Sequence, residues 1–204
     1  LRALRPLAPA LAATPWRRPP LVSAVGLLPG GVFPTTPMRR FPVDGATGWP
    51  PSLWMPSVRM DDGAVVVFGR DRTDVHVVDA VEATSAVPGM FRPKRIDGVA
   101  HVDGAVASAT HADLLVGEGH DVVVISSVMS RPGRRPMRIR ARRQLAAERR
   151  RLEAAGSHTV VVEPDDEIVR IAGGYPRSGP EAGPALVAAA RRRTVSVVGA
   201  IHAA

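Results

Sequence analysis

An aspartate followed by glycine and alanine, Asp103-Gly104-Ala105, is the pattern in this chain best suited to acid–base chemistry. A carboxylate can accept a proton from a hydroxyl group or a water molecule that lies within hydrogen-bond distance. Gly104 tolerates backbone angles that other residues avoid, so the bend can bring the carboxylate to an exposed corner. An isolated Asp-Gly pair is more often a plain turn, in which the carboxylate accepts from nearby amides. The surrounding sequence must therefore decide between a base and a turn.

Apolar runs, turn signals and capping residues predict alternating strands and helices around this corner. The predicted elements are strands over 53–60 and 64–69, a helix capped by Thr73 or Asp74 and running to about Thr84, a tight hairpin at Asp97-Gly98, a short helix over 111–118, a strand over 121–128, a helix over 138–155, a strand over 159–163, a short helix after Asp165 and a helix over 184–198. We predict one α/β domain over residues 1–204, with the 121–128 strand buried on both faces of its sheet.

Three blocks around the corner carry a family resemblance. Residues 83–91 read ATSAVPGMF, residues 96–98 read IDG, and residues 102–105 read VDGA. Together they resemble the second half of a patatin-like phospholipase domain. The resemblance extends over about 53–192 and is strongest between Ser85 and Gly104. It implies a three-layer α/β/α fold, which would be incomplete at the N-terminus because the first half of the family pattern is missing here.

Members of that family are lipid acyl hydrolases with a serine–aspartate dyad. The resemblance implies that Asp103 is the general base, supported in the motif by Gly104 and Ala105. An alcohol is a poor nucleophile at neutral pH until a base accepts its proton, so Asp103 would bond the serine directly. This context favours the catalytic interpretation over the plain turn. Asp97-Gly98 and Asp62-Gly63 are interpreted as hairpin turns.

The nucleophile of the dyad is missing from this sequence. No G-x-S-x-G motif and no glycine-rich oxyanion loop occurs in the 204 residues. We interpret Ser85 as a hydrogen-bonding residue at a helix end, and His101 and His111 as polar surface or supporting groups. We therefore expect a longer product to be an acyl-ester hydrolase and this chain to be inactive alone. The alternative is a truncated, non-catalytic protein that binds anionic lipid or another protein.

An arginine-rich stretch, residues 131–151, is the second conspicuous feature. On a helix, Ala141, Leu145 and Leu152 would share one face, and most arginines would lie on the other. Three interpretations compete: a solvated surface, docking on anionic lipid head groups, and nucleic-acid binding. Aromatic residues are only 4% and no RNA- or DNA-binding motif is present, so nucleic acid is disfavoured. Candidate lipid contacts are Arg138, Arg142 and Arg149.

Composition sets the remaining expectations. The net charge is +8, but Lys94 is the only lysine, and abundant Arg, Ala, Val, Gly and Pro is also typical of GC-rich coding, so the charge carries little weight. The chain has no cysteine, which excludes disulfides and thiolate chemistry. Its histidines form no metal-binding motif, and we expect no metal and no cofactor. The expected substrate is a lipid or other acyl ester, and the expected location is the cytoplasm, with peripheral membrane contact.

Overall fold

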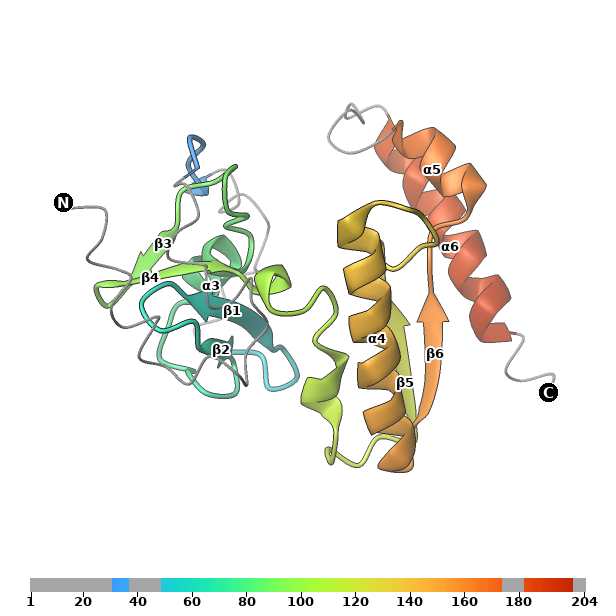
Figure 1. Ribbon diagram of the computed structural model, residues 1–204, viewed down its shortest axis with the longest axis horizontal. Helices are drawn as coiled ribbons and strands as arrows, with labels where there is room; N and C mark the ends of the chain where they lie inside the picture. The colour runs from blue at the N-terminus through green and yellow to red at the C-terminus, as the bar shows by residue number, and fades with distance from the viewer. Residues whose placement is uncertain (1–30, 37–48, 174–181, 200–204) are drawn as a thin grey trace. The chain divides into compact units, whose positions relative to one another are not determined.

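A computed structural model describes residues 31–36, 49–173 and 182–199 (Figure 1). The chain divides into two compact units, Leu1–Ser108 and Ala109–Ala204. Both units combine helices with strands, which confirms the α/β class. Within the described residues the strands form two sheets, one of four strands and one of two, where the resemblance implies a single layered sheet.

The first unit is built on a four-stranded antiparallel sheet in the order β2-β1-β4-β3. Its elements are β1 (Met55–Arg59), β2 (Val65–Phe68), α3 (Val77–Thr84), β3 (Lys94–Ile96), β4 (Val99–Asp103) and the 3₁₀ turn η5 (Gly104–Val106). Asp-Gly turns force neighbouring strands to run in opposite directions. At the tighter turn, Asp97 and Gly98 both have positive φ angles, 48° and 79°, as a two-residue hairpin requires.

Helix α3 packs on β1, β3 and β4. A core cluster of Phe68, Val75, Ala80, Ala83 and Ile96 fills this interface. The predicted helix cap was wrong by a few residues, because His76 rather than Thr73 or Asp74 is the N-cap and accepts from the Val78 amide. Asp74 is instead paired with the Arg72 guanidinium. Val58, Val102 and Val106 form a second small cluster.

The second unit is a strand–helix–strand arrangement followed by two helices. Its elements are the 3₁₀ turn η6 (Ala112–Leu115), β5 (Val122–Ser126), α4 (Pro136–Ala154), β6 (His158–Val162), α5 (Asp166–Ala172) and α6 (Gly183–Gly199). Strands β5 and β6 are parallel because the long helix α4 carries the chain back between them. The buried face of α4 is Ala141, Leu145, Glu148 and Leu152, in agreement with the predicted apolar stripe.

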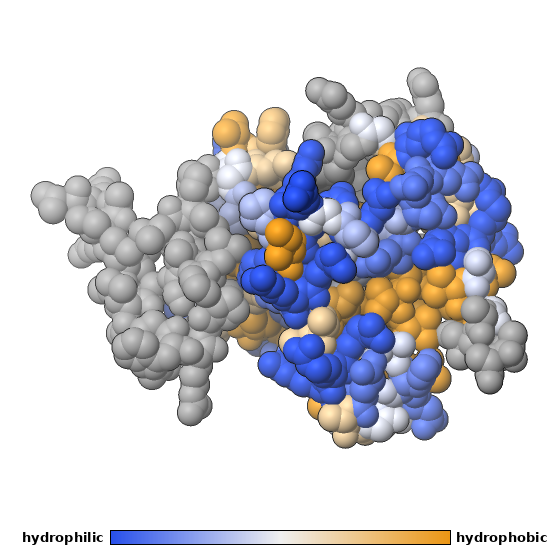
Figure 2. Space-filling view, turned by 45° about the vertical axis from the view of Figure 1, so that its right-hand side comes forward, coloured by the Kyte–Doolittle hydropathy of each residue, from blue (hydrophilic) through white to orange (hydrophobic). Residues whose placement is uncertain are grey.

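The prediction that the 121–128 strand is buried on both faces was wrong. Burial alternates along β5: Val123 and Ile125 pack into a cluster with Leu145 and Leu152, whereas Val122 and Val124 are 52% and 51% exposed. The reason is that the α4 side chains Leu145 and Leu152 pack on one face of β5, while α6 packs on β6. The space-filling view shows an exposed apolar area between hydrophilic areas (Figure 2).

Candidate active site

Asp103 lies at the end of β4, where the strand passes directly into η5. Its backbone angles are φ −49° and ψ 132°, and its Oδ1 accepts from the Ala105 amide at 2.8 Å. Asp103 is half-buried, Gly104 is buried and Ala105 is exposed. The aspartate therefore caps a short helical turn, which fixes the direction of its carboxylate at the rim of the sheet.

Two separate elements hold the backbone of Asp103. Its amide donates to the Ala86 carbonyl at 3.0 Å, and in the sheet it lies opposite Ser57 of β1. Ala86 follows the end of α3, where Ser85 is the C-cap residue and its amide donates to the Val81 carbonyl at 3.1 Å. The helix-end role predicted for Ser85 is confirmed. The two ends of the sequence block from Ser85 to Gly104 are thus held together in space by the hydrogen bond between Asp103 and Ala86.

A buried serine–histidine pair lies behind the aspartate, and sequence reasoning missed it. Ser57 Oγ and His101 Nδ1 are 2.8 Å apart, with the two residues 0% and 4% exposed. The His101 ring also lies 5.4 Å from the Phe68 ring, centroid to centroid. Burial lowers the pKa of His101, and the nearby Arg59 guanidinium lowers it further. Of the two roles predicted for His101, a polar surface group or a supporting group, burial therefore contradicts the first.

Ser57, His101 and Asp103 share one face of the β1–β4 ladder, but they do not form a catalytic triad. Alternate residues of a strand point the same way, so His101 and Asp103 are on one side, and Ser57 is the register partner of Asp103. Ser57 is fully buried, so no ester carbonyl can approach its hydroxyl group. The arrangement supports the strand end that carries Asp103. The nucleophile of an acyl hydrolase would still have to come from outside the described residues.

A polar cavity of about 270 Å³ lies elsewhere in the first unit, between the start of α3 and β3. Most of its charged groups are paired: Arg72 with Asp74 and Asp97, and Lys94 with Asp79 and the buried Glu82. Arg95 donates instead to the Gly98 carbonyl at 2.7 Å. Asp103 does not line this cavity. The cavity is thus lined largely by side chains that form ion pairs with one another or with Glu82.

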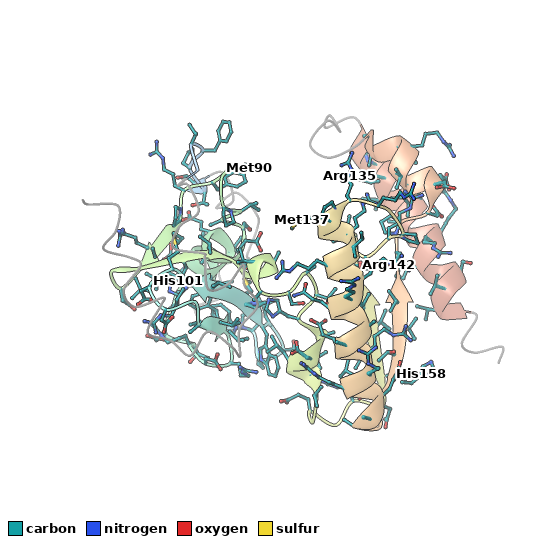
Figure 3. The ribbon with its side chains drawn as sticks, in the orientation of Figure 1. Met90, His101, Arg135, Met137, Arg142 and His158 are labelled. Carbon is teal, nitrogen blue, oxygen red and sulfur yellow. The ribbon has the colours of Figure 1, made fainter. Side chains whose placement is uncertain are left out.

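The candidate lipid contacts on α4 differ in their surroundings. Arg149 donates from Nε to Thr159 Oγ1 at 2.8 Å and pairs with Glu153 at 3.1 Å. Arg142 is exposed and Arg138 half-buried, and neither is paired with a carboxylate in the part of the chain that the structure describes. Figure 3 shows Arg142 on the side of α4 turned to the viewer. Arg142 is therefore free to meet an external anion, whereas Arg149 is held internally.

Within residues 31–36, 49–173 and 182–199, no group of three or more histidine, aspartate or glutamate side chains could hold a metal ion. Over the same residues, none of the helices combines the length and apolar character that crossing a membrane requires.

The structure thus defines an α/β chain with a half-buried aspartate fixed at a strand-to-turn corner. Residues 61–116 match the model of the patatin-like phospholipase family, which confirms the predicted resemblance over that segment. The matched segment contains α3, the β3–β4 hairpin and the Asp103 corner. The match supports a relation to lipid acyl hydrolases, whose substrates are lipids.

Proposed function

We propose that this chain contributes the catalytic base of a lipid acyl hydrolase, with Asp103 as the aspartate of a serine–aspartate dyad. The observation that carries the proposal is the Asp103 corner itself: a carboxylate at a strand end, within the segment that matches the family. The serine and the oxyanion donors would be supplied from outside these 204 residues, since the sequence contains no G-x-S-x-G.

The chemistry follows from what the hydroxyl nucleophile needs. Asp103 accepts the serine proton as the oxygen attacks the ester carbonyl, and it returns that proton to the departing alcohol. The Ala105 amide donates to the carboxylate oxygen Oδ1 at 2.8 Å, which orients the group at the end of the strand. The bonds to Ala86 and the pairing with Ser57 keep the strand end in place during turnover.

The test is an isosteric substitution in a gene product that carries a serine elbow. With a short-chain p-nitrophenyl ester, Asp103→Asn should lower turnover roughly 10²–10⁴-fold, the usual contribution of a general base. Asp97→Asn is the matched control, because it changes an aspartate of the other tight Asp-Gly turn and asparagine tolerates its positive φ. Full activity in Asp103→Asn would refute the assignment. The present chain, assayed alone, should hydrolyse nothing.

A second candidate function rests on α4. The exposed Arg142 and Arg143 have no carboxylate partner among the described residues, and the neighbouring Ile139 is 39% exposed. This combination supports peripheral contact with anionic phospholipid, in which each cation near the surface contributes about 1 kcal/mol. In a hydrolase, such contact would bring the enzyme to its substrate. In a non-catalytic chain, lipid binding would itself be the function.

Vesicle partitioning separates this candidate from a merely solvated helix. Arg142→Gln should weaken binding to phosphatidylserine-containing vesicles about fivefold, the equivalent of about 1 kcal/mol. Arg151→Gln removes the same charge from the same helix, but from an arginine already paired with Asp113, and should change binding less. Binding that ignores lipid charge and salt concentration would rule out this role for α4.

A further inference from the structure

An exposed apolar patch lies on the first unit, and neither the aspartate site nor helix α4 uses it. It consists of Val32, Phe33 and Val87, which are 73%, 61% and 38% exposed, and we call it the apolar knob. These residues come from two segments far apart in the sequence, 31–34 and the turn over 87–91. Single exposed apolar side chains are ordinary, but several on joined segments mark an interaction surface.

The two segments of the apolar knob are fastened to each other. The Phe33 amide donates to the Met90 carbonyl at 3.0 Å, and the Arg92 amide donates to the Phe33 carbonyl at 2.8 Å. The Phe33 and Phe91 rings pack at a centroid distance of 6.4 Å. A Cβ atom on Gly31 would come within 2.2 Å of the Phe91 carbonyl oxygen, so only glycine permits this approach. Figure 1 shows the segment beside the loop before β3, and Figure 3 labels Met90 there.

The apolar knob is also joined directly to the candidate active site. Val87 follows Ala86, whose carbonyl accepts the Asp103 amide at 3.0 Å. The Val87 carbonyl in turn accepts the Met90 and Phe91 amides and closes the turn that holds Phe33. A surface that docks on the apolar knob would therefore lie on residues adjacent to those that fix Asp103.

The chemistry of the patch selects its partner. A stable dimer buries about 800 Å² on each subunit, whereas a phenylalanine, the largest member of the apolar knob, offers only about 150–250 Å². The apolar knob is thus too small to hold a second copy of the chain by itself. Arg92, which is exposed, is bonded through its amide to Phe33 and has no ion pair with the described residues. Apolar side chains beside a cation suit the boundary between acyl chains and phosphates.

We propose that the apolar knob inserts into the acyl region of a phospholipid surface, with Arg92 at the level of the phosphates. The inference rests on the proposed function for its lipid class and adds the place where the first unit meets that lipid. It differs physically from the α4 contact, because insertion of uncharged side chains does not need anionic lipid and survives high salt.

Partitioning onto zwitterionic phosphatidylcholine vesicles in 0.5 M salt (about a 4 Å screening length) tests the apolar knob separately from α4. We expect Phe33→Ser to weaken partitioning by about tenfold or more, because the variant has no phenyl ring to bury among the acyl chains. Val195→Ser is the matched control, since Val195 is 65% exposed on α6, and it should leave partitioning unchanged. Equal partitioning of the unsubstituted chain and Phe33→Ser would overturn the proposal.

Fluorescence quenching tests insertion with variants that are expected to keep binding the vesicles. Phe33→Trp should place an indole among the acyl chains, so brominated phosphatidylcholine should quench its added fluorescence, while Val195→Trp should not be quenched. Equal quenching of both variants would contradict insertion at the apolar knob.

Sedimentation of Phe33→Ser tests the competing occupant, a second copy of the chain. Conversion of a dimer to a monomer, with lipid binding intact, would overturn the proposal in favour of a second copy. Asp103→Asn should retain partitioning, so failure of the hydrolase assignment is seen separately.

Discussion

Acid should destabilise the first unit through His101. The pKa of His101 is lowered, first by burial and then by the Arg59 guanidinium. The unfolded chain titrates near the ordinary histidine value of about 6.5 and so binds the proton more readily than the folded chain. Stability is therefore fully present above about pH 6.5 and is lost as pH falls toward the folded pKa.

The size of the effect follows from the Ser57–His101 contact. Protonation places a positive charge on the His101 ring, which is 4% exposed and whose Nδ1 lies 2.8 Å from Oγ of the fully buried Ser57. A buried polar group with unsatisfied hydrogen-bonding capacity costs about 1–3 kcal/mol, and a charged one costs at least as much. We expect this loss of unfolding free energy between pH 7.5 and pH 5.0. Asp61 and Asp71 do not confuse the measurement, because hydrogen bonds from Arg59 and Arg70 lower their carboxyl pKa values and keep them ionised in this window.

Urea unfolding followed by tryptophan fluorescence measures this transition selectively. All three tryptophans, Trp16, Trp49 and Trp54, fall within the first unit. His101→Gln keeps an acceptor for Ser57 but does not titrate, so its stability should change by less than about 0.5 kcal/mol between the two pH values. His120→Gln, at an exposed position, should behave like the unsubstituted chain. An equal pH dependence in the unsubstituted chain and His101→Gln would refute the reasoning.

Two further substitutions test the two cores. Leu152→Ala should destabilise the second unit by about 2–5 kcal/mol, because Leu152 is 0% exposed and packs with Val123, Ile125 and Leu145; hydrogen exchange over β6 would report it. Lys94→Met should cost about 3–5 kcal/mol in the first unit, because it leaves the buried Glu82 without its cation at 2.5 Å. Adding Glu82→Gln should recover part of that loss, and no recovery would argue against a charge effect.

Local sequence signals predicted the elements well, because short-range chemistry decides them. Asp97-Gly98 supplies both positive φ angles of a tight hairpin, and Asp165 caps α5 by accepting from the Ile168 amide. One error, the N-cap of α3, involves a competing partner. Asp74 pairs with Arg72, and His76 caps the helix instead. Such competition depends on side-chain positions that a residue pattern does not contain.

Long-range packing explains what the sequence could not reveal. Ser57 and His101 are separated by 44 positions, and only the register of β1 against β4 brings them together. A histidine within a strand resembles a surface residue in the sequence pattern, because the pattern does not show its buried partner on another strand. The continuous valine run in β5 predicted burial on two faces, yet the extent of burial depends on which helices cover the sheet.

The Asp103 corner was predictable as a turn and recognisable as a motif, and its geometry is compatible with both roles. The hydrogen bond from Ala105 would exist in a plain turn and in an oriented base alike. Stability measurements will therefore not separate the two. The amide oxygen of Asp103→Asn can still accept from Ala105, so unfolding free energy should change by less than about 1 kcal/mol. An asparagine amide cannot take up the serine proton, so only turnover distinguishes a base from a turn. A variant that folds normally and loses turnover would identify Asp103 as the base, whereas one that keeps turnover would leave it a structural cap.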